Sequence, residues 1–273
     1  MGFLIGWGLG GSRGRGMAPG QRRRWTESEV LAVLSLYCQT PFGKMHTGNP
    51  HVVALAKQID RSPSSIALKL ANLASLDPYH QARGVTGMRN ASRLDRDVWG
   101  RYFGQWELLG EAHCLSEVGS VIAQTKPEAL SVSEDDRPTE VVEERIGRRG
   151  QGFFRNAVLS AYDNRCCLTG IASPALLRAS HIVPWAVSKE SRLDPCNGLC
   201  LNSLHDAAFD RGLMTFSEDC RVMLSTSIEK QMPRDVFDEF FGMYEGEQFK
   251  EPERFVPKGA YFEYHRERVF VGG

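Results

Sequence analysis

The segment between Cys166 and Phe216 constrains the fold more than any other part of the sequence. It reads as a turn, CCLTG, a strand that ends at His181, a long loop that contains Asn197, and a strand or turn that passes into a helix bearing His205. A hairpin of strand, loop and helix would bring the two histidines, 24 residues apart in sequence, to one place. His181 precedes the apolar run IVP, so the residues alone allow a packed core residue, a metal ligand or a catalytic base.

Three motifs in this segment, SHIVPW, NGLCL and HDAAFDRGL, occur in an order that resembles the HNH endonuclease family, and within it a restriction-endonuclease-like subgroup. The resemblance covers residues 150 to 216 closely and residues 25 to 110 less specifically. It implies a ββα-metal hairpin in an enzyme that hydrolyses phosphodiester bonds, with duplex DNA as the substrate. The implied cofactor is a divalent metal, Mg²⁺ first and Mn²⁺ second. A restriction or defence role and products with a 5′-phosphate follow from the same resemblance.

The resemblance also implies a role for each residue of the motifs. His181 is similar to the general base of the family, which takes a proton from the attacking water. Asn197 matches a loop asparagine whose amide holds the loop against backbone groups and so positions His181. His205 matches the metal ligand on the helix, where a divalent cation would bind the scissile phosphate.

Ser180 departs from the family pattern, because many relatives have an aspartate there as a second metal ligand. A hydroxyl is a much weaker ligand, so His205 is expected to be the main protein ligand, with Ser180, water and phosphate completing the shell. On a helix Asp206 lies about 100° from His205 and Asp210 about 140°. Only Asp210 is kept as an outside candidate for a ligand, and the interpretation preferred for it is that it anchors the helix to the loop. Arg192, in the loop, would stabilise the pentacovalent phosphate or form a salt bridge, and both interpretations stay open.

The seven cysteines, an odd number in a chain of 273 residues, do not indicate a disulfide framework. This predicts a reducing, cytoplasmic location. Some HNH proteins brace the hairpin with zinc held by two C-x-x-C pairs, but here Cys166 and Cys167 are adjacent and Cys196 and Cys200 are four apart. Structural zinc is therefore not expected, and the cysteines are expected to pack as small hydrophobic residues.

The N-terminal part of the chain predicts helices. TESE at 26–29 is typical of a capping box, and residues 51–78 indicate helix, turn and helix, with Ser62 as the cap and Pro63 in the first helical position. Lys69 and Asn72 are expected on the outward face, and both are residue types that contact phosphate or base edges. This helix is therefore either a contact for DNA or RNA or part of an ordinary helical hairpin. The residues expected inward are Val53, Ala56, Ile59, Ile66, Leu70 and Leu73.

Composition divides the chain into four parts with an α+β fold. Residues 1–24 are predicted to be a disordered Gly/Arg-rich tail, and residues 25–114 a helical, helix-turn-helix-like domain that binds DNA. Residues 115–144, which include a run rich in proline and acidic residues, are predicted to be a linker. Residues 145–273 are predicted to be the ββα-metal nuclease domain, ending in a strand, a helix and an extended C-terminal segment.

The charges of the chain balance, with 33 Lys+Arg and 33 Asp+Glu. Affinity for nucleic acid must therefore come from local basic patches. No run approaches the roughly 20 apolar residues that span a bilayer, so no membrane partner is predicted, whereas a homodimer stays open. Two other functions also stay open: a DNA-binding regulator whose hairpin is inactive, and a nuclease that acts on RNA or single strands.

Overall fold

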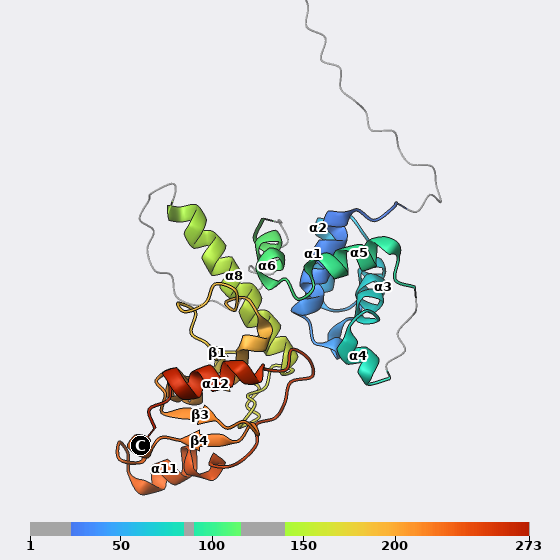
Figure 1. Cartoon of the computed structure of the whole chain (residues 1–273). Coiled ribbons are helices and arrows are strands. Elements are labelled where there is room, and N and C mark those ends of the chain that lie inside the picture. Colours follow the sequence, from blue (N-terminus) through green and yellow to red (C-terminus); the bar gives the residue numbers. More distant parts are fainter. Residues whose placement is uncertain (1–22, 85–89, 116–139, 273) are drawn as a thin grey trace, which may run out of the picture.

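A computed structural model describes residues 23–84, 90–115 and 140–272 of the chain (Figure 1). It combines helices with two small antiparallel sheets, so the predicted α+β class is confirmed. Nearly all of the predicted tail and most of the predicted linker lie outside the described residues. No helix among the described residues is long and apolar enough to cross a membrane.

In the N-terminal helical region, residues 23–115, the regular elements of the described residues are all helices (Figure 1). Its elements are α1 (Glu27–Cys38), η1 (Phe42–Lys44), α2 (Pro50–Gln58), α3 (Pro63–Ala74), α4 (Pro78–Ala82), α5 (Arg93–Tyr102) and α6 (Trp106–Leu115).

The C-terminal region, residues 140–272, holds both sheets. It begins with α8 at residue 140, so α8 includes the last five residues of the predicted linker, 140–144. Its elements are α8 (Glu140–Ala161), β1 (Leu177–His181), η2 (Pro195–Asn197), β2 (Gly198–Asn202), α9 (Ser203–Asp210), β3 (Met214–Phe216), β4 (Val222–Leu224), α10 (Thr226–Glu229), α11 (Arg234–Phe240), η3 (Gly242–Tyr244) and α12 (Gly259–Arg268).

The helix starts of the helical region follow the predicted caps. The Thr26 side chain accepts from the backbone N–H of Glu29, and the Glu29 carboxylate accepts from the backbone N–H of Thr26, which completes the capping box. Ser62 accepts from the backbone N–H of Ser65, with Pro63 in the first turn of α3. Each cap satisfies donors that the first turn of a helix leaves free, so these two predictions are confirmed.

The outward face predicted for α3 is wrong. Lys69 is only 5% exposed and donates to Asp95 Oδ1 over 2.7 Å, and Asn72 is buried as well. The reason is that α5, which carries Asp95, packs against this face of α3. The exposed side chains of α3 include Ser64 and Leu68 and carry no charge. The inward residues predicted for α3, Ile66, Leu70 and Leu73, are all fully buried.

The inward face predicted for α2 is partly wrong. Val53 is 46% exposed, whereas Val52 and Leu55 are buried together with Ala56. The buried set has helical spacing but starts one residue earlier than expected. This rotates the contact face of α2 by about 100° at its N-terminal end.

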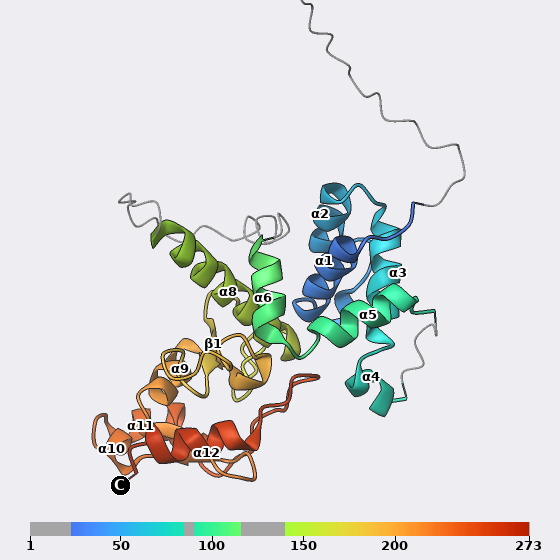
Figure 2. The same ribbon diagram turned by 45° about the horizontal axis from the view of Figure 1, so that its top comes forward.

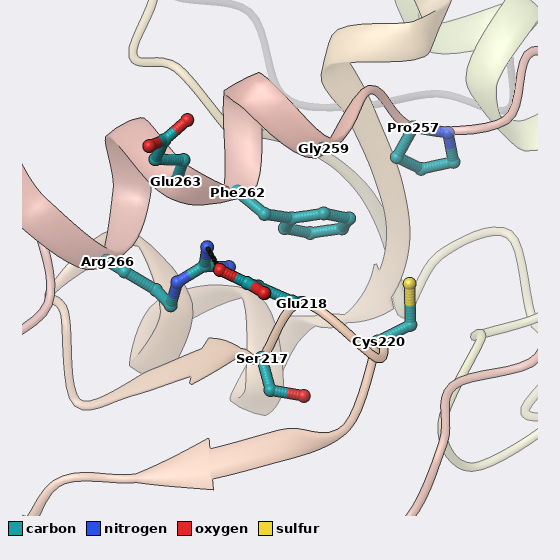
Figure 3. A pocket seen from close by; sticks show the side chains of 8 residues that line it. All are labelled: Ser217, Glu218, Cys220, Pro257, Gly259, Phe262, Glu263 and Arg266. Carbon is teal, nitrogen blue, oxygen red and sulfur yellow. Dashed lines mark ion pairs between the residues drawn. The ribbon is translucent and has the colours of Figure 1, made fainter.

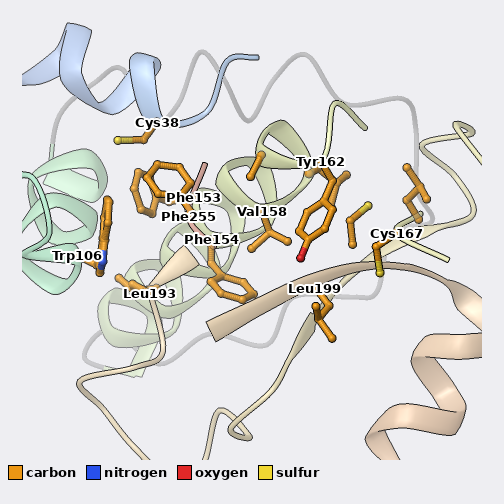
Figure 4. Packing of buried hydrophobic residues seen from close by; sticks show 14 of the residues in the cluster. Cys38, Trp106, Phe153, Phe154, Val158, Tyr162, Cys167, Leu193, Leu199 and Phe255 are labelled. Atoms are coloured by element: carbon orange, nitrogen blue, oxygen red, sulfur yellow. The ribbon is translucent and has the colours of Figure 1, made fainter. Parts of the chain in front are cut away.

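The two regions are in direct contact through a shared hydrophobic core (Figure 4). Trp106 of the helical region packs edge-on against Phe255 of the C-terminal region, with ring centroids 5.2 Å apart. The buried guanidinium of Arg254 donates to the carbonyls of Cys38 and Thr40 over 3.0 and 2.8 Å. The domain boundaries at residues 24, 114 and 144 stay predictions.

The hairpin formed by β1 and β2 lies between α8 and α9 (Figure 2). Its strands are antiparallel, with Leu177 opposite Asn202 and His181 opposite Gly198. Gly198 permits the close approach of α8, because a Cβ there would lie 2.3 Å from Val158 Cγ2. Helix α9 follows β2 directly, which gives the predicted order of strand, loop, strand and helix.

The end of the chain corrects another prediction. Residues 259–268 form the helix α12 instead of an extended segment. Its buried side chains, Phe262 and His265, are three residues apart and pack towards β3. That spacing fits one face of a helix. His265, to which the sequence assigned no role, bonds to Thr215 Oγ1 over 2.9 Å.

Candidate active site

His181 lies at the end of β1, and its ring is fixed on several sides. The ring stacks on Phe154 of α8 with centroids 3.8 Å apart and meets the edge of Trp185. Its Nε2 lies 3.0 Å from the backbone carbonyl of Arg192. Because a carbonyl only accepts, Nε2 carries the hydrogen and Nδ1 keeps a lone pair in the neutral ring.

Burial lowers the pKa of His181 below its ordinary value of 6.5, and the hydrogen bond to the Arg192 carbonyl opposes this only partly. The imidazole is therefore neutral near pH 7. A neutral ring with a defined tautomer is the form that can accept a proton from water.

Asn197 is fully buried and joins both ends of the loop that follows His181. Its Nδ2 donates to the carbonyls of Val183 and Ser191 over 3.0 and 3.1 Å, and its Oδ1 accepts from the Val183 N–H over 2.8 Å. Its own carbonyl accepts from the Ile182 N–H. These bonds hold the backbone on either side of the loop and leave the amide no free polar atom for a reaction.

A pocket of about 330 Å³ opens beside His181 and is bordered by β1, the loop after it, α9 and α12. Asp206 and Asp210 lie one turn apart on α9 and both face this pocket. The Ser180 hydroxyl donates to Asp206 Oδ1 over 2.6 Å. The residues that line the pocket are Ala179, Ser180, His181, Pro184, Trp185, Asp206, Asp210, His265 and Val269.

The environment of the pocket disfavours the charged form of Asp210. Partial burial of the carboxyl group, followed by the Asp206 carboxylate, raises the pKa of Asp210 to about 6, although the residue as a whole is exposed. A pair of carboxylates in this relation gains from a nearby cation.

His205 does not face the pocket, which corrects the prediction that it opposes His181 as the main metal ligand. It is only 2% exposed, and its Nε2 donates to the Phe240 carbonyl over 2.9 Å. Its Nδ1 lies 3.2 Å from Asn202 Nδ2 and accepts that hydrogen bond. Both ring nitrogens are therefore engaged, and the ring packs between the hairpin and the segment around Phe241 and Tyr244.

The oxygen donors of the pocket fit a hard divalent cation. Mg²⁺ prefers carboxylates and retains several waters, and Asp206 and Asp210 present two carboxylates on one helix face. The Ser180 hydroxyl uses its proton to orient Asp206, so it supports a ligand instead of supplying the missing carboxylate. In the described parts of the chain, no three or more His, Cys, Asp or Glu side chains are grouped to hold a metal. Water and phosphate would complete the shell.

The three residues predicted to bind substrate lie in different places. Arg192 lies beside His181: its Nε donates to the Trp185 carbonyl over 2.8 Å, and its guanidinium lies 5.3 Å from the centre of the Trp185 ring. Lys69 and Asn72 belong to α3 of the helical region and do not line the pocket. Of the three, only Arg192 is therefore near His181.

A second cavity, of about 390 Å³, lies between α12 and the turn that joins β3 to β4 (Figure 3). Arg266 crosses it to pair with Glu218 over 3.9 Å. None of the residues predicted for the site lines it.

Asp206 is the pocket residue that the sequence motifs did not single out. If α9 is oriented with His205 towards the site, Asp206 points away from it. The sequence did hold a signal, because Asp206 and Asp210 are spaced by four residues and so share one helix face.

The model of a family described as HNH endonuclease matches residues 166–217. The matched segment contains the hairpin, the loop and α9, so the C-terminal region carries an HNH domain, the fold of nucleases that generally cleave DNA. No curated protein matches the chain. The restriction-like subgroup stays a prediction.

Proposed function

We propose that the pocket beside His181 hydrolyses phosphodiester bonds of duplex DNA with the help of a divalent cation. The observation that carries this proposal is the hydrogen bond from His181 Nε2 to the Arg192 carbonyl, in a pocket that also presents Asp206 and Asp210. It supports His181 as the general base because it leaves Nδ1 free to take the proton of the attacking water.

Each residue of the pocket has a separate role in the proposed reaction. Nδ1 of His181 accepts a proton as the water oxygen bonds to phosphorus, and the Arg192 carbonyl stabilises the imidazolium that forms. Phe154 holds the plane of the ring, and Asn197 holds the loop that carries the carbonyl. Asp206 and Asp210 would bind Mg²⁺ or Mn²⁺, which supplies positive charge to the phosphate oxygens and the leaving 3′ oxygen.

The test is the cleavage of supercoiled plasmid with Mg²⁺ or Mn²⁺, with and without a chelator. The wild-type chain is expected to nick the plasmid only when metal is present. The variant His181→Ala should lose at least about 100-fold in rate, the usual contribution of a general base, while its affinity for a labelled duplex stays within about twofold. The matched control is His46→Ala, because His46 is an exposed histidine of the helical region.

Each alternative has its own outcome in the same assay. A His181→Ala chain that cuts at the wild-type rate would remove the base assignment. Binding of duplex by the wild-type chain without metal-dependent nicking would indicate the regulator. Faster cleavage of RNA or single-stranded DNA than of duplex DNA would identify that nucleic acid as the substrate instead of duplex DNA. A restriction role stays a prediction from the sequence resemblance.

A further inference from the structure

Two arginines from separate elements meet beside the pocket. Arg155 of α8 donates through Nη2 to the Pro174 carbonyl over 3.2 Å. Arg178 of β1 donates through Nη1 to the next carbonyl, Ala175, over 3.1 Å, and to Leu177 over 2.9 Å. The two side chains bond to adjacent carbonyls at the start of the hairpin, and the guanidinium groups are close enough that, after the larger effect of burial, the charge of Arg178 lowers the pKa of Arg155.

Neither arginine is neutralised. In the described part of the chain, no carboxylate lies within 4.0 Å of either guanidinium, which carries its full positive charge. Burial lowers the pKa of Arg155, and the charge of Arg178 lowers it further. Two like charges held together destabilise the free protein, and an anion placed between them would remove that repulsion.

The position of Arg155 and Arg178 suits contact with a DNA strand that enters the pocket. Arg178 precedes His181 by three residues on the same strand, on the order of 10 Å, and leaves β1 on the face of Ser180, whose hydroxyl donates to Asp206 of the pocket. Phosphates of one DNA strand repeat every 3.4 Å or so along the helix axis, so this separation spans about three of them. Asp206, which faces the pocket, is close enough to Arg155 to influence its pKa.

We propose that Arg155 and Arg178 form a phosphate-binding site that holds the DNA backbone a few nucleotides from the bond that is cut. This inference rests on the proposed nuclease function and adds a contact that the motifs do not contain. A guanidinium has five N–H donors, and the bonds to the carbonyls of residues 174, 175 and 177 occupy only one terminal nitrogen of each side chain. The remaining donors can form the paired bonds that guanidinium groups make to phosphate.

The test measures the affinity of the intact chain for a labelled duplex in a His181→Ala background, so that cleavage does not interfere. The dissociation constant is recorded over a range of KCl concentrations for Arg155→Gln, Arg178→Gln and the double variant. The double variant should bind 10- to 100-fold more weakly, and the slope of log K against log salt should fall by about 0.9 for each phosphate that is no longer neutralised. Arg178→Lys should keep the slope because it keeps the charge.

The matched control is Arg221→Gln, because Arg221 is an exposed arginine of the same region that also donates to a carbonyl, that of Gly246 over 2.8 Å. It should change neither affinity nor slope. Thermal unfolding checks each variant, and Arg178→Gln decides alone if Arg155→Gln does not fold, since Arg178 is exposed at the surface.

The failures of the two proposals are distinguishable. An unchanged affinity and slope in the double variant, while the wild-type chain still nicks plasmid, overturns the phosphate site and leaves the nuclease. A wild-type chain that binds duplex but does not nick it with any metal overturns the nuclease. A wild-type chain that does not bind duplex overturns both.

Discussion

The basic side chains of the helical region and those around the pocket have different partners. Several in the helical region pair with carboxylates: Arg23, Arg61, Lys69, Arg93 and Arg101. Four around the pocket donate to backbone carbonyls instead: Arg155, Arg178, Arg192 and Arg211. In the described residues none of these four has a carboxylate within ion-pair distance.

The difference indicates which surface suits the proposed binding of DNA. A guanidinium bonded to a carbonyl keeps its net charge, whereas one bonded to a carboxylate has lost much of its attraction for phosphate. Lys69 and Asp95 in particular form a buried pair inside the helical region. The arginines around the pocket, together with His181 and the two aspartates, are therefore the side chains on which the proposed binding and cleavage of DNA depend.

The largest effect is expected at Asp206. Asp206→Asn should slow metal-dependent plasmid cleavage by at least about 100-fold, because a cation at the transition state contributes several kcal/mol. Duplex affinity should change little, since the arginines remain. Plasmid nicking at several Mg²⁺ concentrations measures the loss, with Asp219→Asn, an exposed aspartate outside the pocket, as the control. Cleavage by Asp206→Asn at the wild-type rate would show that the metal binds at another site.

The next effect is on stability, at Lys69. Lys69→Ala leaves the fully buried Asp95 without its partner, so the free energy of unfolding should fall by about 3–5 kcal/mol. The double variant Lys69→Met with Asp95→Asn removes both charges and keeps the bond that residue 95 accepts from the Ser92 N–H. It should recover most of the stability in urea unfolding and bind duplex as the wild type does. A folded double variant with tenfold weaker binding would give α3 a role in DNA contact.

A smaller effect is expected on the pH dependence of stability, at His265 of the C-terminal region. Burial lowers the pKa of His265 to about 4, against 6.5 in the unfolded chain, with the Phe209 carbonyl opposing the shift. Between these values the unfolded state binds more protons, so stability is lost as pH falls from 6.5 to 4, by about 3 kcal/mol in all. Urea unfolding at pH 7 and pH 4.5 should show a smaller loss in His265→Gln. Equal losses in both chains would place the acid sensitivity elsewhere.

The sequence carried the local features of the site but not the orientation of α9. Order and spacing predicted the strand that ends at His181, the loop that contains Asn197 and the helix after them, and the resemblance to the HNH family implied that Asn197 holds the loop. Which face of that helix meets the pocket depends on the Phe240 carbonyl, which binds His205 from 35 residues further along the chain. Adjacent residues differ by about 100° around a helix, so the choice between His205 and Asp206 needed that long-range contact.

The same limit explains the other corrections. Lys69 reads as a surface residue when α3 is considered alone, and only the packing of α5 brings Asp95 to it. The helical character of the end of the chain is visible only from the burial of Phe262 and His265 on one face of α12. Caps, in contrast, were predictable because they depend on residues three positions apart.

The division between paired and unpaired arginines is tested most directly by arginine footprinting of the intact His181→Ala chain. An arginine-specific dicarbonyl reagent is applied with and without duplex DNA, and the modification rate of each arginine is read by mass spectrometry. DNA is expected to slow modification of Arg178, Arg192 and Arg211 by about fivefold or more, and to leave Arg93 and Arg101 unchanged. Protection of Arg93 and Arg101 without protection of Arg178 and Arg192 would contradict the account.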